Sequence, residues 1–189
     1  QGTFEEYQYL RDIILEKAPC RLLVFSLGKD SEIWMSANED GTTEFVEHEP
    51  DWIAKTEALI PGIVIHRVRY RTKRKQWKRL IDRHNRLWMR DLPQSVRETP
   101  WDIIYVDSPQ GGSDQRPGRM KSIYSAAKLT ENCPDDVDVL LHDCEREVER
   151  YYGDRYLGED KLVRQVGRTR HYRPRECCPP ISRPSLPDS

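Results

Sequence analysis

The chain has 189 residues, enough for one α/β domain with a buried core but too few for two comfortable domains. Charged residues make up 33% of it, yet they nearly cancel to a formal net charge of -1, so overall charge indicates no particular partner. No apolar run is long enough to predict a transmembrane helix or a signal peptide. The five cysteines show no zinc-binding spacing, and their odd number leaves the redox compartment open.

The first elements read as a helix followed by a buried strand. Thr3 and Glu6 form a capping-box pattern, and apolar residues from Phe4 to Ile14 fall on one helical stripe. Five of the seven residues from Arg21 to Leu27 are apolar. This composition is typical of a strand that is buried on both faces of a parallel sheet.

A turn follows this strand at Gly28, and the capping residues Asp30 and Ser31 predict the start of another helix. A buried strand, a glycine turn and a helix form the crevice in which doubly wound α/β domains bind nucleotide-like ligands. One glycine is a weak fingerprint, so this turn alone is compatible with any α/β protein.

Strands and helices alternate along the rest of the chain. Strands are predicted over 42–46, 63–68, 101–106 and 137–141, helices over 50–60, 119–129 and 145–156, and a closing antiparallel pair over 161–166 and 169–172. The helix over 50–60 is expected to turn Trp52, Ile53, Thr56, Leu59 and Ile60 inward. The basic run over 71–90 carries apolar residues at roughly helical spacing. The proline-rich tail over 174–189 is expected to be extended or disordered.

This order predicts one domain over residues 1–173, with an α/β fold. Its core would be a mostly parallel, Rossmann-like seven-stranded sheet with a C-terminal antiparallel hairpin. That is the plan of class I methyltransferases, although a plan alone does not fix function.

Acidic residues follow three of the predicted strands. They are Glu47, Asp107 and Asp143, and in a parallel sheet all three lie at the carboxyl edge, where ligands bind. Glu47 lies about 20 residues after the glycine turn, the spacing at which an acidic residue binds the hydroxyls of a ribose. The alternative is a carboxylate that merely favours a helix start. Together with Gly28, the spacing favours ribose binding.

Asp107 and the adjacent His142 and Asp143 are expected to face the same crevice. Two carboxylates and an imidazole could hold a divalent metal ion. They could also act as a base that removes a hydroxyl proton, and we favour this role over the metal. Taken singly, each residue is more often a hydrogen-bonded core histidine or a turn-capping aspartate.

Two arginines, Arg116 and Arg119, stand at a predicted helix start close to the Asp107 loop. Two guanidinium groups suit a carboxylate ligand, although surface arginines paired to neighbouring acids are about as frequent. The run from Arg67 to Arg90 could bind a polyanion, but a charge run is more often a solvated helix face.

Five segments, in unbroken order, resemble the glucuronoxylan 4-O-methyltransferase family of plant cell-wall biosynthesis. They are PCRLLVFSLGKDS from Pro19, FVEHEPDWI from Phe45, WDIIYVDSPQG from Trp101, PGRMKSIYSAA from Pro117 and HDCEREVE from His142. The resemblance covers roughly Leu10 to Tyr156 and is more specific than any one motif. Ser26, Lys29 and Gln110 depart from the residues usual in that family.

The resemblance implies S-adenosylmethionine as methyl donor and the 4-hydroxyl of a glucuronic acid on xylan, or on a related glucuronate-bearing polysaccharide, as acceptor. It also implies a Golgi-lumen setting behind an N-terminal anchor that these residues do not include. The resemblance also implies a role for each site residue. Gly28, Asp30 and Ser31 would line the methionine end of the donor, Glu47 its ribose, Asp107, His142 and Asp143 the acceptor hydroxyl, and Arg119 the uronate carboxylate.

A sugar O-methyltransferase is therefore the leading hypothesis. The second is a non-catalytic partner protein in glycan biosynthesis, for which the changes at Ser26 and Gln110 would be markers. A nucleic-acid methyltransferase that holds phosphates with the basic run ranks last, because the net charge is close to zero, so no nucleic-acid partner is expected.

Overall fold

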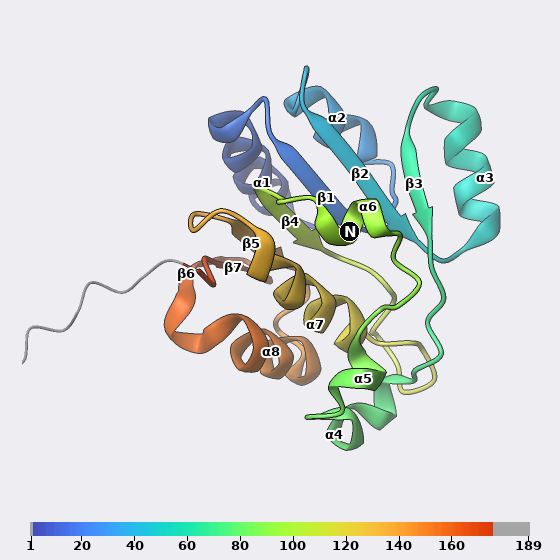
Figure 1. Cartoon of the computed structure of the whole chain (residues 1–189), viewed down its shortest axis with the longest axis vertical. Helices are drawn as coiled ribbons and strands as arrows, with labels where there is room; N and C mark the ends of the chain where they lie inside the picture. Colours follow the sequence, from blue (N-terminus) through green and yellow to red (C-terminus); the bar gives the residue numbers. More distant parts are fainter. Residues whose placement is uncertain (1, 176–189) are drawn as a thin grey trace, which may run out of the picture.

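The computed structural model describes residues 2–175, which form a seven-stranded sheet with helices on both faces (Figure 1). The strand order is β3-β2-β1-β4-β5-β7-β6, and only the last two pairings are antiparallel. The elements are α1 (Phe4–Lys17), β1 (Arg21–Phe25), α2 (Ser31–Ala37), β2 (Thr42–Glu47), α3 (Pro50–Leu59), β3 (Val64–Arg67), α4 (Trp77–Leu80), α5 (His84–Leu87), α6 (Gln94–Glu98), β4 (Ile103–Val106), α7 (Met120–Leu129), β5 (Asp138–Leu141), α8 (Glu147–Gly153), β6 (Leu162–Val166) and β7 (Thr169–Tyr172). The predicted mostly parallel sheet with a C-terminal hairpin is confirmed.

Strand β1 lies in the centre of the sheet because both of its faces are apolar. Val24 pairs with Phe45 of β2 on one side and with Tyr105 of β4 on the other. Side chains of β1 alternate between two cores, one under α1, α2 and α3 and the other under α4 to α8. Leu22 to Phe25 are at most 1% exposed. Full burial of each such side chain stabilises the fold by about 2 kcal/mol.

Helix α1 begins as predicted. The Thr3 hydroxyl accepts from the Glu6 backbone N–H at 3.3 Å, and the Glu6 carboxylate accepts from the Thr3 backbone N–H at 2.6 Å. Leu10 and Ile14 of the predicted stripe are buried. Phe4, the first residue of the helix, is 75% exposed and is not part of that stripe, because it lies before the first turn that packs on the sheet.

Two other expectations about helices are wrong. Residues 71–90 do not form one amphipathic helix but a 3-10 turn over 74–76 followed by α4 and α5. The helical path is broken at Asp82, whose φ of +62° lies in the left-handed region. On α3, Leu59 is 67% exposed instead of facing inward, since it lies in the last turn, beyond the part of the helix that packs on the sheet.

Three of the five cysteines and the first two residues of the predicted tail lie within the described residues. The predicted tail over 174–189 lies outside the described residues from 176 onward, as do Cys177 and Cys178. Cys20, Cys133 and Cys144 are free buried thiols. Within 2–175, every helix is too short or too polar to cross a membrane.

Candidate functional site

Three hollows open at the carboxyl edge of the sheet, and two residues, Asp107 and Gln110, line all of them. The β1 hollow, of about 570 Å³, is lined by Tyr7, Ser26, Leu27, Gly28, Lys29, Asp30, Ile33 and Trp52. The β2 hollow, of about 560 Å³, is lined by Ser26, Leu27, Glu47, His48, Glu49, Asp51, Trp52, Lys55 and Ser108. The β5 hollow, of about 480 Å³, is lined by Gly111, Gly112, Ser113, Arg116, Arg119, His142, Asp143, Arg146 and Arg168. A molecule in one hollow can therefore meet a molecule in another at Asp107.

The turn after β1 is crowded at Gly28 because the Asp30 side chain folds back over it. A Cβ atom on Gly28 would lie 2.2 Å from Asp30 Oδ1. The Gly28 N–H donates to the Ser31 hydroxyl at 3.1 Å, and the Ser31 N–H donates to the Gly28 carbonyl at 3.2 Å. Burial raises the pKa of Asp30, and repulsion from Asp107 adds to this rise. The turn thus brings a carboxylate with a raised pKa to the β1 hollow.

Glu47 ends β2 with one carboxylate oxygen bound and the other available. Oε1 accepts from the His48 N–H and from His48 Nδ1, both at 2.6 Å, and from the Glu49 N–H at 3.1 Å. Oε2 has no hydrogen bond to any residue within 2–175 and lies in a side chain that lines the β2 hollow. Burial raises the pKa of Glu47, but the His48 hydrogen bonds outweigh it and lower the pKa overall. A charged acceptor therefore faces this hollow.

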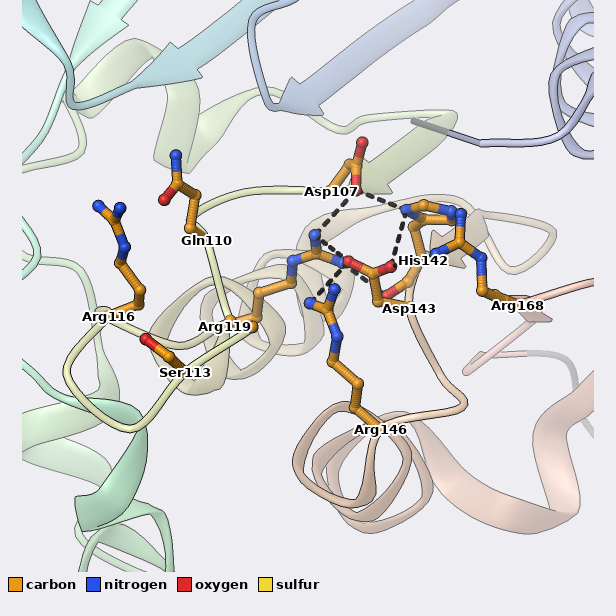
Figure 2. Close-up of a pocket in the computed structure, with 11 residues that line it drawn as sticks. Asp107, Gln110, Ser113, Arg116, Arg119, His142, Asp143, Arg146 and Arg168 are labelled. Atoms are coloured by element: carbon orange, nitrogen blue, oxygen red, sulfur yellow. Dashed lines mark hydrogen bonds and ion pairs between the residues drawn. The ribbon is translucent and has the colours of Figure 1, made fainter.

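Asp107, directly after β4, has the same half-occupied pattern. Its Oδ1 accepts from His142 Nδ1 at 2.7 Å and from Arg119 Nη2 at 2.9 Å (Figure 2). Its Oδ2 has no hydrogen bond within the described part of the chain. Burial raises the pKa of Asp107, but the His142 hydrogen bond and the Arg119 charge lower it overall. Asp107 is thus a held carboxylate with one free oxygen, at the junction of the three hollows.

The carboxylate of Asp143, by contrast, is paired with arginines on both oxygens. Its Oδ2 pairs with Arg119 at 2.6 Å and with Arg146 at 2.8 Å, and its Oδ1 pairs with Arg168 at 3.2 Å (Figure 2). Its φ is +63°, a left-handed conformation that costs about 1 kcal/mol or more outside glycine. Both oxygens of Asp143 are thus paired with guanidinium groups of described residues, so this carboxylate is less available than Asp107 to accept a proton.

His142 does not offer a free nitrogen to the β5 hollow. Nδ1 is bound to Asp107, and Nε2 is buried without a hydrogen bond from any described residue, 3.6 Å from Glu6 Oε2. The whole residue is 2% exposed. His142 thus lies between the carboxylates of Asp107 and Glu6. There it is placed to orient Asp107 rather than to reach a ligand.

The ligand atoms of Asp107, His142 and Asp143 lie within 4.8 Å of one another, as the metal hypothesis requires. However, Arg119 Nη2 bridges the two carboxylates at 2.9 and 2.6 Å. A divalent cation would have to displace this guanidinium, because the two positive charges would otherwise be in contact. The geometry favours the base over the metal, and the metal stays a prediction.

The two predicted substrate arginines are in different environments and do not present two guanidinium groups to one ligand. Arg119 is 4% exposed and donates to the carbonyls of Pro109 and His142 as well as to the two carboxylates. Arg116 is exposed at the edge of the β5 hollow, and its guanidinium has no partner among residues 2–175 (Figure 2). Of the two, only Arg116 is free to bind a ligand.

Sequence reasoning missed several residues of the site. Glu6 was recognised only as a helix cap, and Arg146 and Arg168 carried no signal that they converge on Asp143. Glu149 on α8 is fully buried, and neither of its oxygens has a partner in the described region. A Cβ atom on Gly111 would lie 2.2 Å from Glu149 Oε1, so Glu149 lies directly behind the loop of the β5 hollow. Burial raises its pKa.

Comparison with known proteins places this geometry in context. Residues 5–172 match the family described as IRX15/IRX15L/GXM. Arabinogalactan O-methyltransferase 2 of Arabidopsis thaliana is 36% identical, over 91% of this chain and 66% of that protein. Glucuronoxylan 4-O-methyltransferase 3 of the same plant is 36% identical over 91% and 63%, and Protein IRREGULAR XYLEM 15 is 32% identical over 90% and 60%. The chain thus spans just under two thirds of the length of these relatives.

Among solved structures, a methyltransferase-like protein from Silicibacter pomeroyi superposes with a TM-score of 0.57 at 15% identity. The match covers 91% of this chain and 86% of that protein. At this identity the likeness shows the fold alone.

Proposed function

Since the chain belongs to the IRX15/IRX15L/GXM family, we propose that it is an S-adenosylmethionine-dependent O-methyltransferase that acts on a sugar hydroxyl of a cell-wall polysaccharide. The most specific acceptor we propose is the 4-hydroxyl of a glucuronic acid side residue, and we propose the Golgi lumen as its setting. One observation carries the proposal. The free oxygen of Asp107 lies where the three hollows meet, so a donor and an acceptor in adjacent hollows would both reach it.

The β1 and β2 hollows together suit the donor. Asp30 and the turn at Gly28 offer a carboxylate and backbone groups to the charged amino-acid end. Glu47 Oε2 offers a charged acceptor to the ribose hydroxyls. Trp52 lines both hollows and is fixed by a hydrogen bond from its Nε1 to the Leu27 carbonyl at 2.5 Å. When bound, S-adenosylmethionine supplies an electrophilic methyl group.

The β5 hollow suits an anionic sugar. Arg116 has a free guanidinium there, and Arg146 and Arg168 extend the positive lining. A uronate carboxylate on Arg116 would place the rest of the sugar ring toward Asp107. Arg119 then takes a different role from the one its motif implies, because it holds Asp107 and Asp143 in place.

In the proposed reaction, Asp107 Oδ2 accepts a hydrogen bond from the acceptor hydroxyl and orients its lone pair. With S-adenosylmethionine bound, the hydroxyl oxygen would bond to the methyl carbon as the carbon–sulfur bond breaks with its electron pair moving to sulfur, and Asp107 would take the hydroxyl proton. The hydroxyl proton becomes strongly acidic as this bond forms, so a carboxylate with a lowered pKa is a sufficient base. His142 and Arg119 fix Oδ1, and this orientation supplies a large part of the rate.

The test is transfer of a labelled methyl group from S-adenosylmethionine to glucuronoxylan fragments, with the product identified by NMR. We expect a 4-O-methyl glucuronate signal and its loss in Asp107→Asn. Asp102→Asn, at the opposite end of the same strand, is the matched control and should retain transfer. A folded protein that neither binds S-adenosylmethionine nor transfers methyl would overturn the proposal.

The second candidate is a non-catalytic partner protein. It is favoured by Ser26 and Gln110, which depart from the residues usual in the family and line the hollows in which donor and acceptor would lie. It predicts glycan binding without transfer. A transfer rate that depends on Asp107 would exclude it.

A further inference from the structure

Residues 69–90, the basic segment, concentrate the positive charge of the chain. They hold ten lysines and arginines against one acidic residue, while the other 167 residues hold 21 basic and 31 acidic residues. The near-neutral net charge therefore hides a strongly polarised molecule. Such a concentration of one sign attracts an oppositely charged polymer over several ångströms.

Much of this charge is not used within the fold. Arg74 pairs with Asp114 at 2.7 Å, whereas Arg79, Arg83 and Arg86 are exposed. These three make no ion pair and no side-chain hydrogen bond with any residue in 2–175. The segment is held instead by its apolar side chains, among them Leu80 and Leu87, which are buried in the core. The backbone is thus fixed while the guanidinium groups are left free.

Aromatic rings gather on the basic segment and against it. His84 stacks on Tyr124 with ring centroids 5.2 Å apart, and Tyr156 meets Tyr124 edge-on at 5.1 Å. Trp77 meets Tyr151 at 5.4 Å, and Tyr151 is 39% exposed. Helices α4 and α5 lie together at one end of the molecule, beside α7 (Figure 1). Aromatic rings with a polar tip suit surfaces that are partly apolar and partly wet.

The basic segment also continues into the loop of the β5 hollow. The Arg74 N–H donates to the Arg116 carbonyl at 2.8 Å, and the Lys75 N–H donates to the Asp114 carbonyl at 3.3 Å. The Thr72 hydroxyl donates to the Pro117 carbonyl at 3.2 Å. A polymer held on the segment would therefore run toward Arg116 and the proposed acceptor position.

We propose that the basic segment and its neighbouring aromatic rings form a second binding surface, for an acidic polysaccharide that carries several uronates along its chain. This rests on the proposed function for the class of polymer. Uronates would pair with Arg79, Arg83 and Arg86, and sugar rings would pack on the aromatic side chains. The continuity with the β5 hollow favours a glycan over a nucleic acid, because one polymer can then occupy both surfaces.

The test removes three free charges, in the variant Arg79→Gln/Arg83→Gln/Arg86→Gln. The matched control removes three exposed charges elsewhere, in Arg11→Gln/Arg97→Gln/Arg164→Gln. Binding to polymeric glucuronoxylan is measured by affinity electrophoresis at low and high salt. We expect binding to weaken about tenfold in the first variant, to be unchanged in the control and to fall with salt in the wild type. Arg83→Gln alone should give a smaller change in the same direction.

Methyl transfer separates this inference from the proposed function. With a fragment that carries a single uronate, the triple variant should match the wild type. With the polymer, its KM should rise. If neither the wild type nor a variant transfers methyl, the proposed function fails. The electrophoresis still decides whether the basic segment binds the polysaccharide. Wild-type glucuronoxylan binding by the triple variant would overturn the inference. The inference would also be overturned if the wild type bound poly(U) RNA more tightly than glucuronoxylan and the triple variant lost this binding. That result would assign the surface to nucleic acid.

Discussion

The two ends of strand β4 carry aspartates with opposite environments. Asp102, at the amino end, receives hydrogen bonds from Arg21 on both oxygens, at 2.7 Å on Oδ1 and at 2.8 and 2.9 Å on Oδ2. Asp107, at the carboxyl end, is bound by described residues on Oδ1 only. Burial raises the pKa of both residues, but their partners lower it overall. A lowered pKa therefore does not distinguish them, whereas the free oxygen does.

Strand β5 repeats the contrast in another form. Asp138, at its amino end, is held by Lys17, His171 and Arg173 at 2.7 to 2.9 Å. Beyond the carboxyl end of β5, the carboxylate of Asp143 is also paired on both oxygens, but its arginine partners line the β5 hollow instead of the core. We infer that the carboxylates at the amino edge of the sheet stabilise the fold through ion pairs with other segments. The carboxyl edge uses its carboxylates to hold Asp107 and the arginines around open space.

The largest expected effect is on catalysis. Asp107→Asn keeps the shape of the side chain and removes the charge that accepts the proton, so the methyl-transfer rate should fall about 100-fold or more. Donor affinity, measured by calorimetry, should change little. If Asp102→Asn lowered the rate as much, the contrast between the ends of β4 would have no functional meaning.

The next effect is on stability. Burial raises the pKa of Asp138, but hydrogen bonds from His171, Arg173 and Lys17 lower it to about 2, against 3.8 in the unfolded chain. The carboxylate thus contributes stability above pH 3.8, which is lost as the pH falls toward 2. Asp138→Asn should lower the free energy of unfolding by about 2 kcal/mol at pH 7, measured with urea. Equal stabilities of variant and wild type at pH 7 would contradict this.

Donor binding gives the third effect. Glu47→Gln removes the charge of the oxygen that faces the β2 hollow, so affinity for S-adenosylmethionine should fall about tenfold, or 1.4 kcal/mol. Titration calorimetry measures it. Glu44→Gln, on the same strand but paired with His66 at 2.6 Å, is the control and should bind as the wild type does. Unchanged affinity in Glu47→Gln would place the ribose elsewhere.

The smallest expected effect is a gain in stability. Burial raises the pKa of Glu149, so its charged form is disfavoured in the folded state above the ordinary pKa of glutamate. Glu149→Gln should therefore raise the free energy of unfolding by about 1 kcal/mol at pH 7. The gain should vanish at a pH below the ordinary value, where glutamate is neutral in both states. A loss of stability at pH 7 would mean that this carboxylate has a partner that stabilises its charge.

The fold was predictable because its signals are local. The capping box of α1, the apolar run of β1 and Pro50 at the start of α3 each act within a few residues. The carboxyl edge followed from the parallel topology, which places Glu47 and Asp107 on one side of the sheet. The prediction of one helix in the basic segment was wrong, because a helical spacing of apolar residues fits two short helices on either side of Asp82 as well as it fits one long helix.

The partners within the site could not be predicted, because they come from distant segments. Glu6 reaches His142 from a helix more than a hundred residues earlier, and Arg168 reaches Asp143 from the turn of the closing hairpin. Arg116 and Arg119 are three residues apart, yet one is exposed and the other buried. Sequence spacing does not reveal which of two nearby guanidinium groups is already paired.

The most direct measurement is a crystal structure with S-adenosylhomocysteine bound. We predict that its ribose hydroxyls lie on Glu47 Oε2 and its sulfur beside Asp107, with the β5 hollow still open to an acceptor. A ligand that lies away from Glu47, or a sulfur that faces away from Asp107, would contradict the role proposed for the carboxyl edge of the sheet.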